Sequence, residues 1–409
     1  MSESTPHVTY CSNIHPGESW AETLANIRHR ATEVKALVRP DAPMGLGLRL
    51  SARAARELLA EPVGLEALRT ELDELGLYVF TLNGFPYGSF HAAPVKEAVY
   101  RPDWRTAERV TYTDELVRIL AALLPGGVGG SISTVPVGFR AEIAADASAV
   151  ARSVEGLLAC AETMWRLREA RGIEIALAIE PEPACHLETT EEALRFVQQV
   201  LLGNEGVERF AQRTGLAARD AEDALRRHLG LCLDTCHAAV AFEEPRATVR
   251  AIEAAGVRIA KVQATTGLHA EPVDEVRQEA LQRFADPIYL HQVVAQCRDA
   301  QVGVVLERFV DLDEALASLA RGAHRPTCWR VHYHVPIFER ELAPFTNTQE
   351  FLAEALDEVL ARRLCAQIEV ETYTWSVLPE RYRRQALSEM IAGELRWVDA
   401  AVAARGETA

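Results

Sequence analysis

The stretch Leu229-Gly-Leu-Cys-Leu-Asp234-Thr-Cys-His237 decides the fold class. It is a short apolar run that ends in a carboxylate, and the residues after it form a helical pattern that stops near Gly256. A run without polar alternation is typical of a parallel strand that is buried on both faces. The stretch therefore predicts one strand–helix unit of a parallel sheet.

The same unit recurs along the chain, with amphipathic helices between the strands. Eight apolar runs fit this pattern: His7–Asn13, Met44–Leu50, Gly76–Asn83, Gly130–Pro136, Ile173–Glu180, Leu229–Asp234, Val257–Gln263 and Ala366–Glu371. Eight such runs predict an α/β protein with a (β/α)8 TIM barrel. A doubly wound open sheet is the alternative, and it is weakened because no GxGxxG motif follows the first strand.

Two connections exceed the usual length. Residues 201–228 are expected to extend the helix layer, and residues 264–328 read as an insertion before a further β run at Trp329–Ile337. Long insertions on a barrel usually cover the catalytic end. We therefore expect one barrel domain over residues 1–409, with 264–328 covering that end.

Composition narrows the functional classes. The chain has 409 residues and a net charge of -16, which argues against nucleic-acid binding because phosphate contacts need a basic face. No signal peptide and no long apolar segment is visible, and the eight cysteines form no CxxC pair. A cytoplasmic protein with reduced thiols is the expectation.

Carboxylates follow three of the predicted strands, at Glu180, Asp234 and Glu371. The carboxyl ends of barrel strands converge, so these groups would repel one another unless protons or a cation intervene. A divalent metal held by oxygen ligands and an imidazole or amide is the simplest resolution. Glu369 shares a face with Glu371 and is expected one layer deeper, paired with an arginine.

Lys261 lies inside an apolar strand, where a Schiff-base lysine and a lysine paired with a carboxylate are both open. No Gly-x-Ser-x-Gly motif and no P-loop appears, so neither a serine hydrolase nor a P-loop nucleotide-binding protein is supported.

The ends of the fifth, sixth and eighth predicted strands resemble the xylose-isomerase-like superfamily of barrels. The segments are Ile179-Glu-Pro-Glu182, Leu233-Asp-Thr-Cys-His237 and Ile368-Glu-Val-Glu371. That group contains sugar isomerases, ketose 3-epimerases, inosose dehydratases and endonucleases that act at abasic sites. The resemblance implies that Asp234 binds metal and that His237 contacts substrate.

A closer resemblance is to the Ebo-type metabolite traffic proteins, E component. It rests on the segments Tyr10–Trp20, Thr81–His91, Tyr289–Gln292, His332–Pro336 and Val370–Trp375. It implies partners among the enzymes of one pathway, including a membrane prenyltransferase, and gives little mechanism.

The sequence departs from the superfamily where the ketose epimerases place a metal-binding histidine. Counting forward from Asp234 leads to Gln263, whereas counting back from Glu371 leads to His332 and His334. The expected metal set is Glu180, Asp234, Gln263, His334 and Glu371. Carboxylates and an amide alone favour Mg2+ or Mn2+, and an added imidazole shifts the preference toward Mn2+, Co2+ or Zn2+.

The chemistry that suits these groups is proton transfer next to a carbonyl. Glu180, Glu371 and His237 are the expected catalytic residues. The expected substrate contacts are Asn13, His15, Asn83, Phe85, Tyr87, Glu182, Lys261 and His332. A metal-dependent isomerase or epimerase of a sugar, cyclitol or related polyol is the leading hypothesis. A non-catalytic metabolite carrier or scaffold is the alternative, and an abasic-site endonuclease is disfavoured by the charge.

Overall fold

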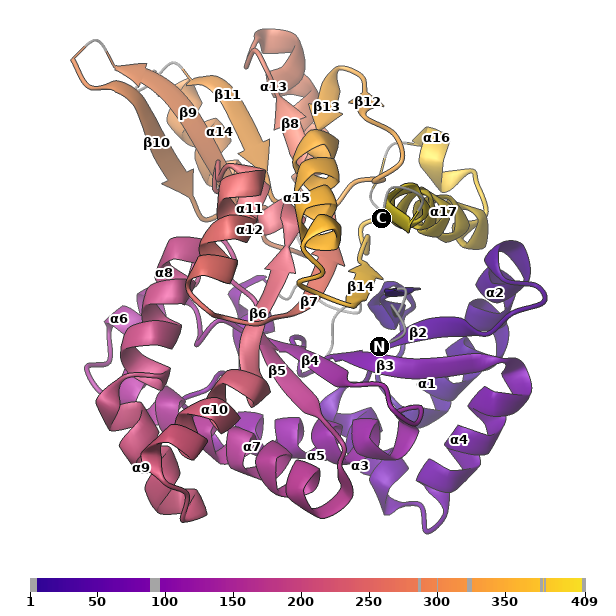
Figure 1. Cartoon of the computed structure of the whole chain (residues 1–409). Helices are drawn as coiled ribbons and strands as arrows, with labels where there is room; N and C mark the ends of the chain where they lie inside the picture. Colours follow the sequence, from indigo (N-terminus) through magenta and orange to yellow (C-terminus); the bar gives the residue numbers. More distant parts are fainter. Residues whose placement is uncertain are drawn as a thin grey trace.

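Eight parallel strands form the barrel in the order β1-β14-β7-β6-β5-β4-β3-β2 in the computed structural model (Figure 1). The structure describes residues 6–88, 96–285, 288–299, 301–321, 326–375, 378 and 380–406, so the end of the segment Thr81–His91 lies outside the described residues. The strands are β1 (His7–Tyr10), β2 (Met44–Arg49), β3 (Leu77–Asn83), β4 (Gly130–Thr134), β5 (Ile175–Ile179), β6 (Leu229–Asp234), β7 (Ile259–Ala264) and β14 (Gln367–Val370). The predicted (β/α)8 barrel with an insertion after its seventh strand is confirmed.

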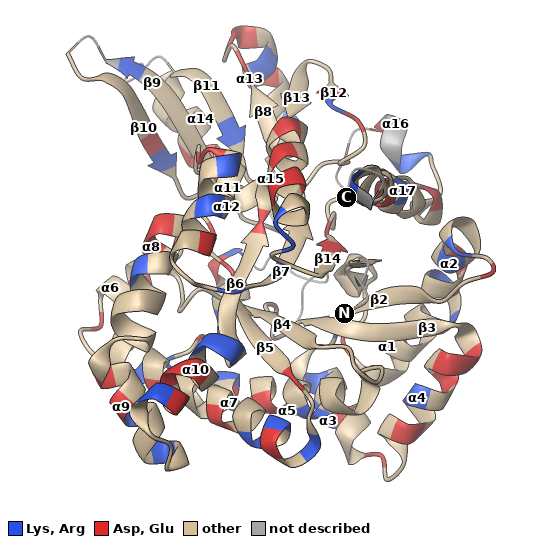
Figure 2. Ribbon diagram, in the orientation of Figure 1, with Lys and Arg blue, Asp and Glu red and all other residues tan. Residues whose placement is uncertain are grey.

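Helices surround the barrel, and Figure 2 shows the charged residues mostly on these helices while the barrel strands are largely tan. Residues 201–228 form two of the helices, as expected. The helices are α1 (Trp20–Asn26), α2 (Thr32–Val38), α3 (Ala52–Ala60), α4 (Gly64–Leu75), α5 (Ala107–Leu123), α6 (Arg140–Ala144), α7 (Ala149–Arg171), α8 (Thr190–Phe196), α9 (Asn204–Thr214), α10 (Ala218–His228), α11 (Thr235–Val240), α12 (Pro245–Ala254), α15 (Gln349–Ala361), α16 (Glu380–Arg383) and α17 (Leu387–Gly406). Among the described residues, no helix has the length and apolar character needed to cross a membrane.

A second sheet lies between β7 and β14 in the sequence and projects from one side of the barrel (Figure 1). Its six strands are antiparallel and run in the order β10-β9-β11-β8-β13-β12. They are β8 (Leu268–Ala270), β9 (Val293–Asp299), β10 (Gly303–Phe309), β11 (Pro326–Val331), β12 (Glu341–Leu342) and β13 (Phe345–Asn347), with α13 (Glu275–Leu281) and α14 (Leu312–Ala320). This sheet continues past residue 328, because β11 to β13 pair within it.

The barrel closes between β1 and β2 with few backbone bonds. One bridge joins Cys11 to Gly47, and the Thr9 hydroxyl accepts a bond from Gly47 N (2.7 Å) and donates one to Gly45 O (2.8 Å). A side chain thus replaces part of the ladder where the two strands meet. Gly47 is required here, because a Cβ on it would lie 1.9 Å from Glu369 Oε1.

The centre of the barrel holds an ion pair between Lys261 and Glu369, both fully buried. Glu369 therefore lies one layer below Glu371 as expected, but its expected partner was an arginine and the structure gives Lys261. The register explains this, because Glu369 is aligned with Gln263 on the neighbouring strand β7. Lys261 is two residues before Gln263 and so faces the same side of β7.

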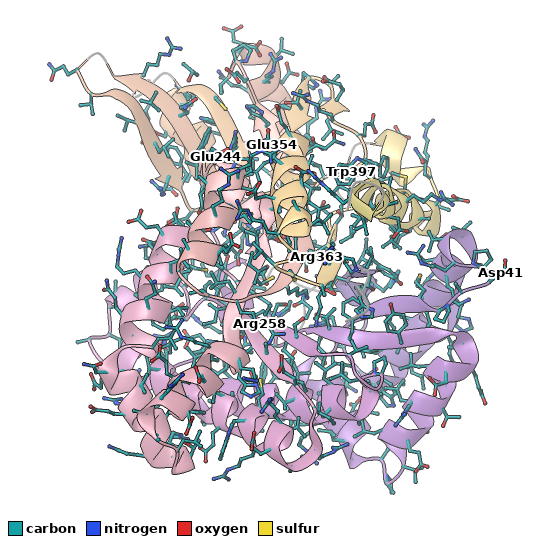
Figure 3. The ribbon with its side chains drawn as sticks, in the orientation of Figure 1. Asp41, Glu244, Arg258, Glu354, Arg363 and Trp397 are labelled. Carbon is teal, nitrogen blue, oxygen red and sulfur yellow. The ribbon has the colours of Figure 1, made fainter. Side chains whose placement is uncertain are left out.

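Charged contacts also fasten the helix layer. Arg246 of α12 reaches α15, where its Nε donates to Glu354 (3.1 Å) and its Nη1 to Asp357 (3.2 Å). Figure 3 labels Glu354 on this helix.

Glu394 of α17 is buried and accepts hydrogen bonds from the Thr372 hydroxyl (2.7 Å) and from Ile337 N (3.3 Å). It thereby ties the segments after β14 and β11 to one helix.

We expect removal of one partner of the central ion pair to destabilise the protein strongly. Lys261→Met should lower the free energy of unfolding by about 3–5 kcal/mol, because it leaves a buried charge uncompensated. Lys261→Met/Glu369→Gln should cost less than the sum of the single changes. Urea unfolding measures both. The matched control is Lys96→Met, which breaks a part-exposed pair with Asp311 and should cost about 1 kcal/mol or less. Equal losses of unfolding free energy in Lys261→Met and Lys96→Met would contradict the assignment of Lys261 and Glu369 as a buried ion pair.

Glu394 gives a pH-dependent prediction. Burial raises the pKa of Glu394 to about 8. The folded state then binds this proton more tightly than the unfolded state, so the stability from this group is present at low pH and is lost as pH rises through the folded pKa. Glu394→Gln keeps an acceptor for both bonds and removes the titration. The melting temperature of the variant relative to wild type should rise from about pH 5 to about pH 9. A constant difference over that range would refute the prediction.

Candidate active site

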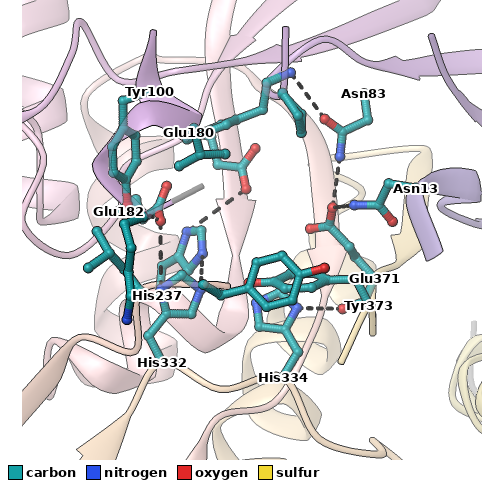
Figure 4. A pocket seen from close by; sticks show the side chains of 16 residues that line it. Asn13, Asn83, Tyr100, Glu180, Glu182, His237, His332, His334, Glu371 and Tyr373 are labelled. Carbon is teal, nitrogen blue, oxygen red and sulfur yellow. Dashed lines mark hydrogen bonds and ion pairs between the residues drawn. The ribbon is translucent and has the colours of Figure 1, made fainter. Parts of the chain in front are cut away.

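A pocket opens at the carboxyl ends of the barrel strands (Figure 4). Residues at and after the ends of barrel strands contribute to it, as do the segments before β9 and after β11 of the second sheet. The lining residues are Asn13, Asn83, Phe85, Pro86, Lys96, Val99, Tyr100, Glu180, Glu182, His237, Tyr289, Leu290, His332, His334, Glu371 and Tyr373. The expected covering role of 264–328 stays a prediction, although Tyr289 and Leu290 from that range line the pocket.

Three carboxylates converge in this region. Glu180 follows β5, Asp234 ends β6 and Glu371 follows β14, and one oxygen from each lies within 4.8 Å of the others. All three side chains are buried. Burial, together with the nearby Glu371 and Asp234 carboxylates, raises the pKa of Glu180, and burial and Asp234 likewise raise that of Glu371. Repulsion among the three buried carboxylates is unfavourable when they are ionised, and a bound cation would reduce it.

Asp234 is held through one of its oxygens. Its Oδ1 accepts bonds from Cys236 N (2.8 Å), His237 N (3.0 Å) and the Thr265 hydroxyl (2.6 Å). The aspartate thus caps the start of α11, which is why the chain turns from strand to helix at this residue. Its Oδ2, like Glu180 Oε2, is buried and finds no hydrogen-bond partner among the described residues.

Glu371 is held by three side-chain amides. Asn13 and Asn83 donate to its Oε1, at 2.5 and 2.8 Å, and Gln263 donates to its Oε2. Asn13 and Asn83 therefore position this carboxylate as well as lining the pocket. Bonds of this kind favour the ionised form of the carboxylate.

His334 presents an available nitrogen at the same place. Its Nδ1 donates to the backbone oxygen of Glu371 (2.6 Å), which leaves the lone pair on Nε2. That Nε2 is buried and without a hydrogen-bond partner in the part of the chain that the structure describes. A ring nitrogen of His334 lies within 4.8 Å of ligand atoms of Asp234 and His237. Burial lowers the pKa of His334 to about 4, so the ring is neutral.

Gln263 is oriented differently from a metal ligand. Its Oε1 accepts a bond from the Cys232 thiol (2.9 Å), and its amide nitrogen faces Glu371. Of the alternatives for the remaining ligand, His334 is the one with an available donor atom. Glu180, Asp234 and Glu371 form one set of potential ligands, and Asp234, His237 and His334 form a second set that shares Asp234. Oxygen and nitrogen ligands are therefore both available to a divalent cation bound at Asp234.

His237 and His332 form a second feature, with their Nε2 atoms 3.1 Å apart. His237 Nδ1 donates to Pro181 O (2.9 Å), and His332 Nδ1 donates to Gln292 Oε1 (2.7 Å). With both Nδ1 atoms protonated, a bond between the two Nε2 atoms requires one further proton. Burial and the neighbouring His237 lower the pKa of His332.

Glu182 and Tyr100 continue this network. The Tyr100 hydroxyl donates to Glu182 Oε1 (2.7 Å) and accepts from Gln292 Nε2 (2.8 Å). Gln292 also donates to Pro183 O (3.1 Å), which fixes its oxygen toward His332. Figure 4 shows His237, His332, Tyr100 and Glu182 grouped on one side of the pocket and Glu371 with its asparagines on the other.

Three of the expected substrate contacts lie elsewhere among the described residues. His15 bonds the Tyr10 hydroxyl (3.1 Å) and lines a separate small cavity. Tyr87 packs its ring against Tyr112, with centroids 5.1 Å apart. Lys261 is beneath the pocket in its ion pair with Glu369. The expected Phe85, Glu182 and His332 all line the pocket, as do Asn13 and Asn83.

Sequence reasoning missed several lining residues. Tyr373 is two residues after Glu371, and Tyr289 packs against it with ring centroids 5.2 Å apart. Period-two spacing from Glu371 was an available signal for Tyr373. Tyr100 and Lys96 sit on a short 3₁₀ turn in the long connection between β3 and α5, where no strand pattern indicates what a side chain faces.

The chain matches no protein-family model, and no curated protein matches it. Similar solved structures include the IolI protein with a bound zinc atom, at 11% identity over 98% of this chain and 99% of that chain, with a TM-score of 0.47. The probable 3-DHS dehydratase AsbF involved in petrobactin synthesis from Bacillus anthracis is 11% identical over 96% and 98%, with a TM-score of 0.43. A xylose isomerase domain containing protein from Salmonella typhimurium is 11% identical over 98% and 99%, with a TM-score of 0.36.

These neighbours are xylose-isomerase-like TIM-barrel proteins. Their TM-scores lie below 0.5, so they carry no argument about substrate or reaction. The barrel itself is established by the strand order and the parallel register of this chain.

The buried ligand atoms of Glu180, Asp234 and His334 that have no hydrogen-bond partner among the described residues predict that the protein binds metal. Purified wild-type protein should hold near-stoichiometric Mn, Zn or Co, measured by inductively coupled plasma mass spectrometry, and a chelator should lower its melting temperature. Glu180→Gln and Asp234→Asn should each lower the bound metal by about one equivalent relative to wild type. Glu394→Gln removes a buried carboxylate outside the pocket and should retain it. Absence of metal, together with no thermal stabilisation by added divalent ions, would rule out the site.

Proposed function

We propose that this protein is a divalent-metal-dependent isomerase or epimerase of a sugar, cyclitol or related polyol that acts through an enediolate. The observation that supports this most is the set of orphaned buried atoms on Glu180, Asp234 and His334 beside the amide-held Glu371. Glu180, Asp234 and Glu371 would hold a divalent ion, which would supply stabilisation of negative charge next to a substrate carbonyl.

The protein's own groups would move the protons. Glu180, ionised and with one unbonded oxygen, takes the proton from the carbon next to the carbonyl. Glu371, across the pocket, returns a proton to the same carbon from the other face, which inverts it, or to the neighbouring carbon, which isomerises the substrate.

The remaining lining residues would bind and orient the substrate. The Nε2 atoms of His237 and His332 would contact a substrate hydroxyl. Phe85, Tyr289 and Tyr373 form an aromatic wall that suits the C–H face of a ring and limits water at the reacting carbon. Glu182 would accept a bond from another hydroxyl.

A second candidate is a metabolite carrier or scaffold that docks a pathway enzyme. One observation favours it: apolar side chains are exposed on and beside the edge strand β10, where Val302 is 77% and Val304 is 59% exposed. In line with the resemblance to Ebo-type proteins, we propose a place in a metabolite-traffic pathway, with a membrane prenyltransferase among the possible partners. This candidate predicts metabolite binding without turnover.

Exchange of a substrate C–H proton with solvent tests the reaction directly. The metal-loaded protein should incorporate deuterium from D2O into a ketose, aldose or inosose of a polyol panel, observed by proton NMR. Glu180→Gln and Glu371→Gln should slow exchange by about 10²–10⁴-fold. Tyr87→Phe, which changes a ring outside the lining, should exchange at the wild-type rate. Ligand binding without any exchange would favour the carrier instead.

A further inference from the structure

A second group of metal-type donors lies in the antiparallel sheet, outside the barrel pocket. Ligand atoms of His269, Glu271 and Cys328 lie within 4.8 Å of one another. His269 Nε2 is 3.0 Å from Cys328 Sγ and 3.5 Å from Glu271 Oε2. These residues come from β8, from the residue after it and from β11, neighbouring strands in Figure 1.

The strand register accounts for this convergence. His269 is aligned with Arg330, so their side chains face the same side of the sheet. Cys328 is two residues before Arg330 and therefore faces that side too. Arg330 is engaged by α11, because its Nη1 donates to Ala239 O (2.6 Å) and its guanidinium lies 4.3 Å from the Phe242 ring centroid.

The geometry differs from that of a nucleophile–base relay. In a relay, the thiol contacts one ring nitrogen of the histidine and the orienting carboxylate contacts the other. Here both Cys328 Sγ and Glu271 Oε2 approach the same nitrogen, Nε2 of His269. Three different donor atoms thus converge toward one point, as ligands of a single ion do.

We propose that His269, Glu271 and Cys328 bind a divalent cation of the Zn2+ class. Thiolate, imidazole and carboxylate are the ligands that Zn2+ takes in proteins, and two negative charges balance the ion. Cys328 is 2% exposed, whereas the Glu271 side chain is 62% exposed, so the site opens to solvent on one side and leaves a fourth position for water. Burial raises the pKa of Cys328 to about 12, so the ion would displace a thiol proton on binding.

An ion bound at His269, Glu271 and Cys328 would also affect the neighbouring strands. An ion held there joins β8 to β11, and β11 ends at Val331, next to His332. It would therefore stabilise the strand that leads into the two histidines of the pocket, His332 and His334. The proposal does not depend on the proposed reaction, because it rests on residues outside the pocket.

Cobalt titration under reducing, anaerobic conditions tests the site, because a thiolate bound to Co2+ gives a near-ultraviolet charge-transfer band that oxygen and nitrogen ligands do not give. The titration uses Asp234→Asn as the background, so that the pocket carboxylate set is broken. This protein should show the band at one equivalent of Co2+. Adding Cys328→Ser should remove the band, and adding His269→Gln should weaken Co2+ binding by about tenfold or more.

Cys236→Ser is the matched control, because Cys236 is a buried cysteine whose Sγ lies within 4.8 Å of ring nitrogens of His332 and His334. Added to the same background, it should leave the band intact. A band that persists in the Cys328→Ser protein, or that disappears with Cys236→Ser, overturns the proposal, as does absence of a band from the background protein. Should Cys328→Ser fail to fold, His269→Gln supplies the same test through the affinity for Co2+.

Discussion

The structure around the pocket depends on the burial of three carboxylates within 4.8 Å of one another. Like charges in a low-dielectric site repel strongly, so the surroundings must supply positive charge or donors. The protein supplies part of this: three amides on Glu371, two backbone N–H groups and a hydroxyl on Asp234, and the Lys261 ammonium below. Lys261 is already balanced by Glu369, and a cation in the pocket would supply the remaining positive charge.

The pocket is built from two parts of the chain, the barrel and the segment that follows strand β11 of the second sheet. Carboxylates come from the ends of barrel strands, whereas the imidazoles of His332 and His334 come from the segment that follows β11. The contact between His334 Nδ1 and the backbone of Glu371 joins the two parts and sets which ring nitrogen is available. The pocket therefore combines hard oxygen donors with imidazole, and its two sides carry separate ionisable groups.

The sequence predicted the barrel because its signal is local. Strands buried on both faces read as short apolar runs, and each run here falls on a strand of the closed sheet. The same logic brought Glu180, Asp234 and Glu371 together, because the carboxyl ends of barrel strands must share one rim. It also placed Glu369 one layer below Glu371, through the period-two alternation of side chains.

What the sequence by itself determined is thus the direction in which each strand residue faces and the end of the barrel at which it lies. Tertiary structure decided the partners: Lys261 with Glu369, Gln263 with Cys232 and Glu371, and His334 with Asp234. It also decided that His15 and Tyr87 lie away from the pocket while Tyr100 enters it. The physical reason is that strand periodicity is fixed by neighbouring residues, whereas these contacts depend on strand register and on how long connections fold over the rim.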